Sequence, residues 1–485
     1  MLYHSTRNNQ ISVDSAQAVL SGLAPDGGLY VPAALPQIDV EACLQENTMA
    51  MAARIIGAML PDIPNMETLV SRAYQGKFQT EELTPTVDTG KFTVLELFRG
   101  PTSAFKDVAL CMLPQLLTAA KREKGMQEDI LILTATSGDT GKAALAGFAD
   151  VEGVKICVFY PQGGVSAVQR AQMVTQEGNN VAVCAVEGNF DDAQTGVKNI
   201  FASAVEGRLP AGNRLRLSTA NSINIGRLAP QITYYFKAYA DLLRRGQITM
   251  GDKVNFCVPT GNFGDILAGW LAKRLGLPVG KLVCASNANN VLTDFIETGT
   301  YDRRRPLHKT ASPSMDILVS SNLERLLYFL SGDTELVANL MKQLNTDGFY
   351  TVPDSLKQAI AEEFWAGYCD DAKAKETIKN VFDNQHYLCD THTATGWAVA
   401  EDYVNQTGDT RPMVVLSTAS PYKSPAAVLS SLEEAPEMDE FDQMEYLSKS
   451  TGTVIPNNLS GLREKEERHT GVIAKDAMLD FVMAL

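Results

Sequence analysis

Apolar runs of strand length, separated by glycine-rich turns and helical patterns, dominate the middle of this sequence. Five of them lie at residues 130–134, 154–160, 181–186, 254–258 and 282–285. Each run is mostly continuous rather than alternating, which is typical of a strand covered by helices on both faces. Strands that alternate with helices in this way predict an α/β fold with a parallel sheet of βαβ units.

Periodicity and composition divide the chain around this α/β region. Amphipathic stretches at 40–60 and 66–75 predict helices near the N-terminus, after a turn-rich start. A further buried-type strand at 413–417 is expected to rejoin the main sheet. The predicted segments are a mostly helical N-terminal domain (1–90), the α/β domain (91–300), an inserted mainly helical domain (301–380), and a return to the α/β domain with an acidic C-terminal region (381–485).

The charge balance argues against a polyanionic partner. The chain has 42 basic and 57 acidic residues, a net charge of -15, whereas nucleic acid or an anionic membrane requires a basic face. Nearly half of that charge lies in residues 433–445, which contain seven acids and no Lys or Arg, and we interpret them as a solvated surface segment. A small anionic ligand stays compatible, because a site needs only local positive potential.

Cysteine spacing and hydropathy point to the cytoplasm. None of the eight cysteines is spaced as CxxC, and several lie in apolar runs, so we expect buried reduced thiols. The first thirty residues contain no apolar signal core, and the apolar runs are far shorter than the ~20 residues of a membrane span. We therefore expect a soluble cytoplasmic protein. It is expected to be a monomer or a homodimer, and the sequence does not distinguish the two. The five histidines are scattered and predict no metal site.

Two glycine-rich turns follow predicted strands and open predicted helices. The first is TATSGDTGK at 134–142, and the second is PTGNFGD at 259–265. A helix N-terminus offers free N–H groups, and glycine lets an anion approach the backbone, so either turn could hold a phosphate or carboxylate. Each could equally be an ordinary tight connection. Neither matches GxGxxG, and the first lacks the Walker A glycine and the Ser or Thr after Lys142.

A lysine in the segment ELFRGPTSAFKDVAL, residues 96–110, is the third candidate feature. If the helix begins near Thr102, Lys106 lies between two apolar stripes, one with Leu110 and one with Val108. Such a lysine either extends its amine to solvent or is buried with a lowered pKa. The second state is what Schiff-base chemistry with a carbonyl cofactor requires.

This segment resembles the pyridoxal-phosphate attachment site of the serine/threonine dehydratase group, with Lys106 at the attachment position. Nine further motifs are similar to those of threonine synthases and follow in the same order from residue 3 to about 424: YHSTR (3–7), GLAPDGGLYVP (22–32), SGDTG (137–141), NSINIGR (221–227), GNFGD (261–265), SPSMDI (312–317), SNLER (321–325), DTHTATG (390–396) and LSTA (416–419). The resemblance implies a fold-type-II pyridoxal-phosphate enzyme, similar to the tryptophan synthase β chain, with mostly parallel sheets.

The resemblance also implies roles for individual residues. Lys106 would hold pyridoxal 5'-phosphate and later move protons, Thr418 would face the pyridine nitrogen, and Asp139 would lie near the ring oxygen O3′ in a role that stays open. The cofactor phosphate would be held by Gly261, Asn262, Phe263, Gly264 and Asp265. The substrate would be bound by Thr136, Ser137, Gly138, Thr140, Asn221, Ser222 and Arg227.

The implied reaction converts O-phospho-L-homoserine and water into L-threonine and phosphate, the last step of threonine biosynthesis. The alternatives are a related phospho-lyase that yields a 2-oxo acid and a serine/threonine dehydratase. A dehydratase needs no second phosphate pocket, so the segment that ends at Arg227 favours the synthase branch. If Arg227 does not serve that pocket, Lys142 or Arg325 could. For His392 we expect a structural hydrogen-bonding role.

Overall fold

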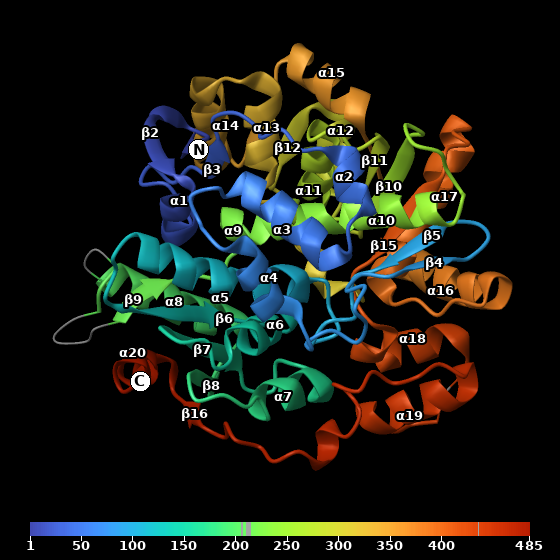
Figure 1. Ribbon diagram of the computed structural model, residues 1–485. Helices are drawn as coiled ribbons and strands as arrows, with labels where there is room; N and C mark the ends of the chain where they lie inside the picture. The colour runs from blue at the N-terminus through green and yellow to red at the C-terminus, as the bar shows by residue number, and fades with distance from the viewer. Residues whose placement is uncertain (205–206, 210–214, 435) are drawn as a thin grey trace.

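Two mostly parallel sheets form the frame of the molecule, and helices pack around both (Figure 1). The computed structural model describes residues 1–204, 207–209, 215–434 and 436–485. Within these residues the larger sheets have the strand orders β14-β11-β10-β15-β5-β4 and β16-β8-β7-β6-β9. Two small antiparallel sheets accompany them.

The six-stranded sheet is covered by helices on both faces. Its strands are β4 (Thr86–Asp88), β5 (Thr93–Glu96), β10 (Val254–Pro259), β11 (Val279–Ser286), β14 (Phe364–Tyr368) and β15 (Met413–Ser417), all parallel to their neighbours except β4. Along β10, Phe256 and Val258 belong to the core shared with α10 (Ile232–Arg244) and α11 (Gly264–Arg274). Cys257 between them belongs to the core of α17 (Thr391–Thr407). Because successive side chains point to opposite faces of a strand, neither face of β10 meets water.

The five-stranded sheet is parallel throughout. Its strands are β6 (Asp129–Ala135), β7 (Val154–Pro161), β8 (Val181–Val186), β9 (Leu215–Ser218) and β16 (Val472–Ile473). Ile132 packs into the core shared with α6 (Asp139–Phe148), whereas Leu133 packs with α8 (Phe190–Ser203) and α20 (Met478–Met483) on the other face. Helix α7 (Ala167–Val174) connects β7 to β8.

All six predicted strands are present, but they divide between the two sheets. The strand predicted at 413–417 is β15, and it lies between β10 and β5 as expected. Continuous apolar runs identify buried strands without identifying their partners, so the sequence pattern did not separate one sheet from two.

The N-terminal region contains strands that the sequence analysis interpreted as turns. β1 (Leu2–Ser5), β2 (Asn8–Asp14) and β3 (Tyr30–Pro32) form an antiparallel sheet. The helices expected after them are present as α2 (Val40–Gln45), α3 (Thr48–Met59) and α4 (Met66–Tyr74), preceded by α1 (Ser15–Ser21). β1 and β3 are only four and three residues long, and β2 is largely polar, so none of the three shows the continuous apolar run by which the other strands were predicted.

The segment after residue 300 is mainly helical and also contributes one strand to the six-stranded sheet. Its helices are α13 (Leu323–Ser331), α14 (Thr334–Asp347), α15 (Asp354–Glu363) and α16 (Asp371–Gln385), which follow α12 (Val291–Thr298). Strands β12 (Thr300–Asp302) and β13 (Phe349–Thr351) pair antiparallel, with α13 and α14 between them in the sequence. Strand β14 pairs with β11 at the sheet edge, so this segment shares the main sheet.

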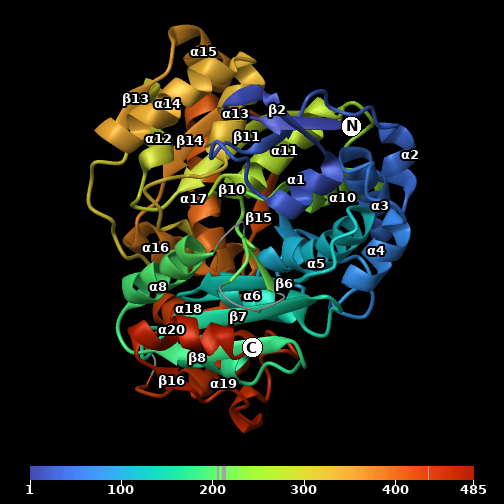
Figure 2. The same ribbon diagram turned by 90° about the vertical axis from the view of Figure 1, so that its left-hand side faces the viewer.

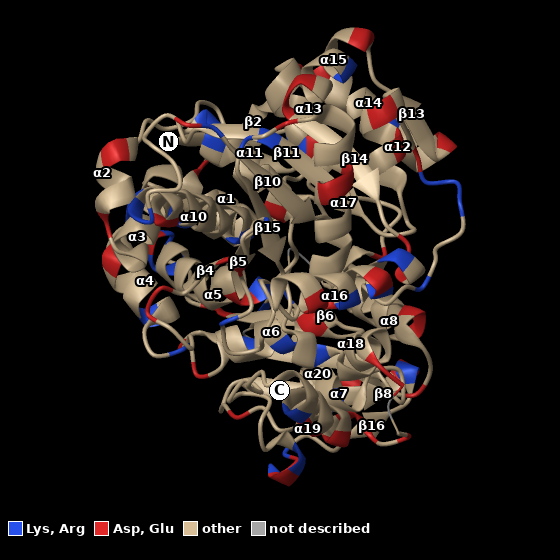
Figure 3. Ribbon diagram, turned by 90° about the vertical axis from the view of Figure 1, so that its right-hand side faces the viewer, with Lys and Arg blue, Asp and Glu red and all other residues tan. Residues whose placement is uncertain are grey.

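The C-terminal region returns to both sheets. After α18 (Pro425–Leu432) and α19 (Glu440–Thr451), the chain pairs β16 with β8. The acidic segment 433–445 lies at the surface as expected, and four of its acids also make contacts, among them Glu445, which pairs with Lys449. Arg463 pairs with Asp439 and Asp442, and Glu440 accepts hydrogen bonds from the first N–H groups of α7. Acidic and basic residues accordingly lie together around α19 (Figure 3).

Helix α5 (Lys106–Glu123) lies between the two sheets (Figure 2). Its residues Leu110, Leu113 and Leu116 share one core with side chains from both sheets. All eight cysteines are buried free thiols, as expected. Among the described residues, no helix combines the length and apolarity that a membrane crossing needs. The fold thus places the first residue of α5, Lys106, where the loops of both sheets meet.

Candidate active site

Lys106 is the first residue of α5, four residues later than the predicted helix start at Thr102. The carboxylate of Asp107 explains the difference, because it accepts hydrogen bonds from the Thr102 backbone N–H at 2.8 Å and from the Thr102 hydroxyl at 2.6 Å. These bonds hold residues 102–105 in a loop, in which Ser103 adopts a left-handed φ of 62°. A Cβ on Gly100 would stand 2.5 Å from the Cβ of Asp107, so this turn requires glycine.

The Lys106 amine lies among charges from four loops. Burial lowers its pKa to about 8, although the residue keeps some exposed surface. Asp139 and, more weakly, Asp265 act to raise that pKa, whereas Arg227 and Lys423 act to lower it. The structure therefore favours the buried, partly neutral lysine over an amine extended to solvent. It also brings together loops that are far apart in the sequence.

The second glycine-rich turn, Gly261–Asp265, forms the N-terminus of α11. Phe263 precedes the helix with a φ of 67°, and its ring is fully buried. A Cβ on Gly261 would lie 2.6 Å from the carbonyl oxygen of Ser314. The Gly261 carbonyl accepts from the Ser320 hydroxyl at 2.6 Å, and the Asn262 carbonyl accepts from the Asn322 N–H at 2.9 Å. The turn is thus held from behind at the start of α11, where a helix offers N–H groups to an anion. One of them, the Ile266 N–H, is used by the Asp265 carboxylate.

Within this turn, Gly264 and Asp265 are the first two residues of α11. The Asp265 carboxylate accepts from the Ile266 N–H at 2.9 Å, and burial raises its pKa to about 7. Its backbone carbonyl accepts from the Tyr235 hydroxyl at 2.5 Å. These contacts fix the first turn of α11 against α10.

The first glycine-rich turn forms the N-terminus of α6 in the other sheet. The Thr136 hydroxyl accepts from the N–H groups of Gly138 and Gly141, at 3.0 and 3.1 Å, and donates to the Gly138 carbonyl. Its hydrogen bonds therefore hold its own loop. Ser137 is exposed and Thr140 is partly buried, so both hydroxyls remain accessible beside the turn.

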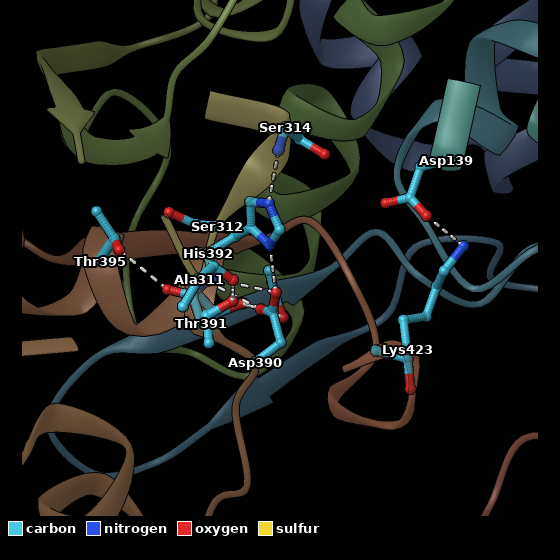
Figure 4. Close-up of polar contacts among 12 residues, drawn as sticks. Asp139, Ala311, Ser312, Ser314, Asp390, Thr391, His392, Thr395 and Lys423 are labelled. Carbon is cyan, nitrogen blue, oxygen red and sulfur yellow. Dashed lines mark hydrogen bonds and ion pairs between the residues drawn. The ribbon is translucent and has the colours of Figure 1, made fainter. Parts of the chain in front are cut away.

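Asp139, the first residue of α6, forms an ion pair with Lys423 at 2.6 Å. Figure 4 shows the two side chains approaching each other from α6 and from the segment after β15. Burial would raise the pKa of Asp139, but the charges of Lys423 and Lys106 outweigh burial and lower it to about 2. Asp139 is therefore ionised.

Arg227 is a buried cation on the short helix α9 (Ile225–Leu228). Its side chain donates to the Ala220 carbonyl at 2.7 Å, and its buried Nε has no hydrogen-bond partner. No carboxylate pairs with it among the residues that the structure describes, and burial lowers its pKa to about 10. A buried guanidinium with an unused donor is costly unless an anion joins it.

The neighbours of Arg227 in the motif 221–227 have separate contacts. The Asn224 side chain caps α9 by accepting from the Gly226 N–H at 2.8 Å. Asn221 is exposed, and Ser222 uses its carbonyl to accept from Asn322. The Ser222 hydroxyl donates to the Asn221 side chain at 3.4 Å, just before α9.

The two other cations considered for a second phosphate are occupied by protein groups. Arg325, which is fully buried, donates to the carbonyls of Tyr30 and Ile223 and to the Asn322 side chain. Lys142 donates to Gln176 at 2.6 Å, and burial lowers its pKa to about 7. Arg227 is consequently the best suited of the three.

Thr418 directly follows β15 and is 4% exposed. Its carbonyl accepts from the Phe105 N–H at 2.8 Å, which ties the strand end to the residue before Lys106. None of the hydrogen bonds among the described residues uses its hydroxyl, so that hydroxyl is available to a ligand beside Lys106.

His392 acts as the structural group that the sequence analysis expected. Its Nδ1 lies 2.7 Å from Asp390, and its Nε2 accepts from the Ser314 N–H at 3.3 Å (Figure 4). The Ser314 carbonyl lies close to Gly261. The hydrogen bonds from Asp390 through His392 to Ser314 therefore support the turn that precedes α11.

Three family profiles cover most of the sequence. "Threonine synthase N terminus" matches residues 2–74, "Pyridoxal-phosphate dependent enzyme" matches 79–419, and "Threonine synthase, C-terminal" matches 393–482. The chain belongs to the threonine synthase family of pyridoxal-phosphate-dependent enzymes. The family assignment agrees with the resemblance carried by the motifs.

Known members of this family are similar over the whole chain. The threonine synthase of Pseudomonas aeruginosa is 38% identical, with 97% of this chain and 98% of that protein covered. The crystal structure of pyridoxal-phosphate-bound threonine synthase from Brucella melitensis superposes with a TM-score of 0.87 at 36% identity, covering 100% of this chain and 99% of that one. These similarities confirm the predicted fold-type-II architecture.

Human threonine synthase-like 1 is also 36% identical over 95% of this chain. This chain spans 64% of the length of that protein. The threonine synthase family therefore includes relatives with two different names, and membership alone leaves the product of the reaction to be assigned.

The residues present fit pyridoxal phosphate, the cofactor of this threonine synthase family. Lys106 has the lowered pKa that an attachment lysine needs, and α11 offers a helix N-terminus backed closely by Ser314. The free hydroxyl of Thr418 is a neutral partner for a ring nitrogen. These groups gather around one amine without any other rearrangement of the fold.

Lys423 is a site residue that the sequence analysis missed. It is 4% exposed and reaches Asp139 from the segment after β15. One signal was present in the sequence, because Lys423 follows shortly after a predicted strand, and ligand sites collect at the carboxyl ends of parallel strands.

Proposed function

We propose that this enzyme is a threonine synthase that converts O-phospho-L-homoserine and water into L-threonine and phosphate. The observation that carries the proposal is Arg227, a buried guanidinium with an unpaired Nε and no carboxylate partner among the described residues. A buried guanidinium with a free donor suits a substrate that carries a second anionic group in addition to its α-carboxylate, as a phosphorylated amino acid does.

Two separate anion sites support this reading. The N-terminus of α11, with Gly261, Asn262, Phe263 and Gly264, would bind the cofactor phosphate through backbone N–H groups. Arg227 would bind the substrate phosphate through charge-assisted hydrogen bonds, with Asn221 and Ser222 beside it. Asp265 would serve the first site by fixing the α11 turn rather than by touching the phosphate, since a carboxylate repels it.

The loop at residues 136–140 would bind the substrate carboxylate. Ser137 and Thr140 offer accessible hydroxyls, and the N–H groups at the start of α6 favour an anion. Gly138 allows close approach, because its backbone carries no side chain. Thr136 would contribute by holding this loop in shape, since its hydroxyl already bonds within it.

Lys106 would carry the proton transfers. When bound, the pyridoxal ring supplies an electron sink that stabilises negative charge formed on the substrate. An amine with a pKa of about 8 can accept a proton from the substrate Cα or Cβ near neutral pH and return it. Asp139 would lie near the ring oxygen O3′, and Thr418 would offer its hydroxyl to the ring nitrogen. After phosphate has left Cγ, a proton would be added at Cγ to form the methyl group of threonine, and water would be added at Cβ.

The setting of the enzyme follows from its chemistry and surface. The substrate is a small phosphorylated amino acid, and a net charge of -15 gives no support to a nucleic-acid or anionic-membrane partner. We propose a cytoplasmic enzyme in threonine biosynthesis that acts as a monomer or homodimer.

Product analysis tests the proposal. Purified enzyme with O-phospho-L-homoserine should release threonine and phosphate in equal amounts and show the visible absorbance of a lysine-bound cofactor. Lys106→Ala should lose both, whereas Lys91→Ala, at an exposed lysine, should lose neither. Release of phosphate with 2-oxobutyrate instead of threonine would assign the enzyme to the phospho-lyase branch and overturn the proposal.

A further inference from the structure

Lys423 connects three segments that surround the cofactor lysine. It lies in the short helix η3 (Pro421–Lys423), which follows β15 of the six-stranded sheet. Its ammonium pairs with Asp139 at 2.6 Å and donates to the Thr102 carbonyl at 3.0 Å. Asp139 begins α6 in the five-stranded sheet, and Thr102 lies in the loop that leads to Lys106. One buried ammonium thus links both sheets to the segment that carries Lys106 (Figure 4).

The charge of Asp139 needs this partner. An ionised carboxylate would lie beside the ring oxygen of the cofactor and close to the substrate carboxylate, and all of these groups repel one another. Lys423 is the nearest cation to Asp139, and the charge of Lys106 helps it to keep the carboxylate ionised. His392 acts in the same direction more weakly. With Lys423 in place, the pair carries no net charge.

We propose that Lys423 is a positioning residue that neutralises Asp139 and holds it, together with the Thr102 carbonyl, at a fixed place beside Lys106. This inference rests on the proposed function, because that function gives Asp139 its place next to the cofactor. It also gives Asp139 a role, which the sequence analysis left open. Asp139 acts as one half of an ion pair, and the charge of Lys423 offsets the repulsion between its carboxylate and the ring oxygen of the cofactor.

The proposal predicts that removing Lys423 and removing Asp139 shift the pKa of Lys106 in opposite directions. The groups that act on the Lys106 amine are Asp139 and Asp265, which favour its charged form, and Arg227 and Lys423, which oppose it. Removing Lys423 leaves Asp139 unbalanced and raises the pKa of Lys106. Removing Asp139 leaves Lys423 unbalanced and lowers it. A purely structural role would not produce opposite shifts.

The test compares Lys423→Met, Asp139→Asn and the double variant with the wild type. In the full chain freed of cofactor, acetylation of Lys106 by limiting acetic anhydride is followed by peptide mass spectrometry from pH 6 to 11. The midpoint should rise by about 1 pH unit in Lys423→Met and fall by about 1 unit in Asp139→Asn. It should return near the wild-type value in the double variant. In the cofactor-loaded enzyme, turnover of Lys423→Met should fall at least about tenfold, and the double variant should recover part of it.

Lys237→Met is the matched control, because Lys237 also forms a buried ion pair, with Asp241 on α10, but contacts none of the site loops. It should lower stability and leave the Lys106 midpoint unchanged. The inference is overturned if the two single variants shift the midpoint in the same direction or not at all, or if the double variant is as slow as Lys423→Met. If the wild-type enzyme loaded with cofactor shows no absorbance that depends on Lys106, the proposed function is overturned instead. The two failures can therefore be told apart.

Discussion

A Cβ atom placed on Gly261 would lie 2.6 Å from the carbonyl oxygen of Ser314. Ser314 is in turn held by His392, whose Nε2 accepts the Ser314 N–H, and His392 is held by Asp390. The backbone that precedes α11 therefore packs against a segment that is itself held by hydrogen bonds. Any side chain at position 261 must push the turn forward, into the space proposed for the cofactor phosphate.

Gly261→Ala should weaken pyridoxal phosphate binding without unfolding the protein. Relieving a contact of this kind costs about 1–3 kcal/mol, which corresponds to roughly a 5- to 150-fold increase in the dissociation constant. Titration of the cofactor-free enzyme, followed by visible absorbance, measures the effect. Ser314→Ala is the control, because it removes the side chain and keeps the carbonyl. Unchanged affinity in Gly261→Ala would contradict the proposed phosphate site.

Arg227→Met should weaken recognition of the phosphorylated substrate while the cofactor stays bound. A charge-assisted hydrogen bond to a buried anion is worth about 1.5–3 kcal/mol, so kcat/KM for phosphohomoserine should fall about 10- to 150-fold. Inhibition by inorganic phosphate should weaken in parallel, and the visible spectrum should stay. Arg325→Met offers the contrast, since the three hydrogen bonds of Arg325 to protein groups predict a loss of stability there. Full activity in Arg227→Met would move the second phosphate site elsewhere.

Activity should rise with pH through about 8. The Lys106 amine must be neutral to accept a proton, and burial lowers its pKa from 10.5 to about 8, so the neutral fraction grows as pH increases toward and past that value. Because Lys106 is bound to the cofactor in the free enzyme and its amine is released only after the substrate binds, we expect kcat to increase about tenfold per pH unit on the acid side and to level off above pH 8. The second ionisation of a substrate phosphate lies near pH 6. If the pH profile shows only the ionisation near pH 6 and none near pH 8, the protonation state of Lys106 does not control the rate.

The sequence predicted the buried strands and the site loops because both leave local signals. A strand covered on both faces, such as β10, appears as a continuous apolar run. Gly261 before α11 marks a close backbone approach, and Gly138 and Gly141 at the α6 turn are closely approached by side chains. Lys106 drew attention because a lysine between apolar stripes is unusual. Periodicity alone left open whether Lys106 extends to solvent or is buried, and the order of the family motifs identified it as the cofactor-binding lysine.

What the sequence did not predict depends on contacts between distant residues. The helix start at Lys106 is set by Asp107 bonding back to Thr102, a side-chain contact that helical periodicity does not record. The division into two sheets depends on which strands pair, and runs of similar composition do not encode that choice. The role proposed for Lys423 depends on its ion pair with Asp139, which begins α6 and lies far away in the sequence.

Gly147→Ala should destabilise the fold more than other glycine substitutions in helices. Gly147 lies on α6, where a Cβ would stand 2.0 Å from the backbone carbonyl oxygen of Leu110 on α5. Backbone atoms cannot rotate away as a side chain does, so the two helices must separate, which costs about 1–3 kcal/mol or more. Urea unfolding should show the loss as a lower midpoint at unchanged slope. Gly57→Ala on α3 is the matched control, because its Cβ would meet Met66 at an ordinary 3.7 Å and alanine favours a helix. Equal stability of the two variants would show that α5 and α6 do not approach so closely.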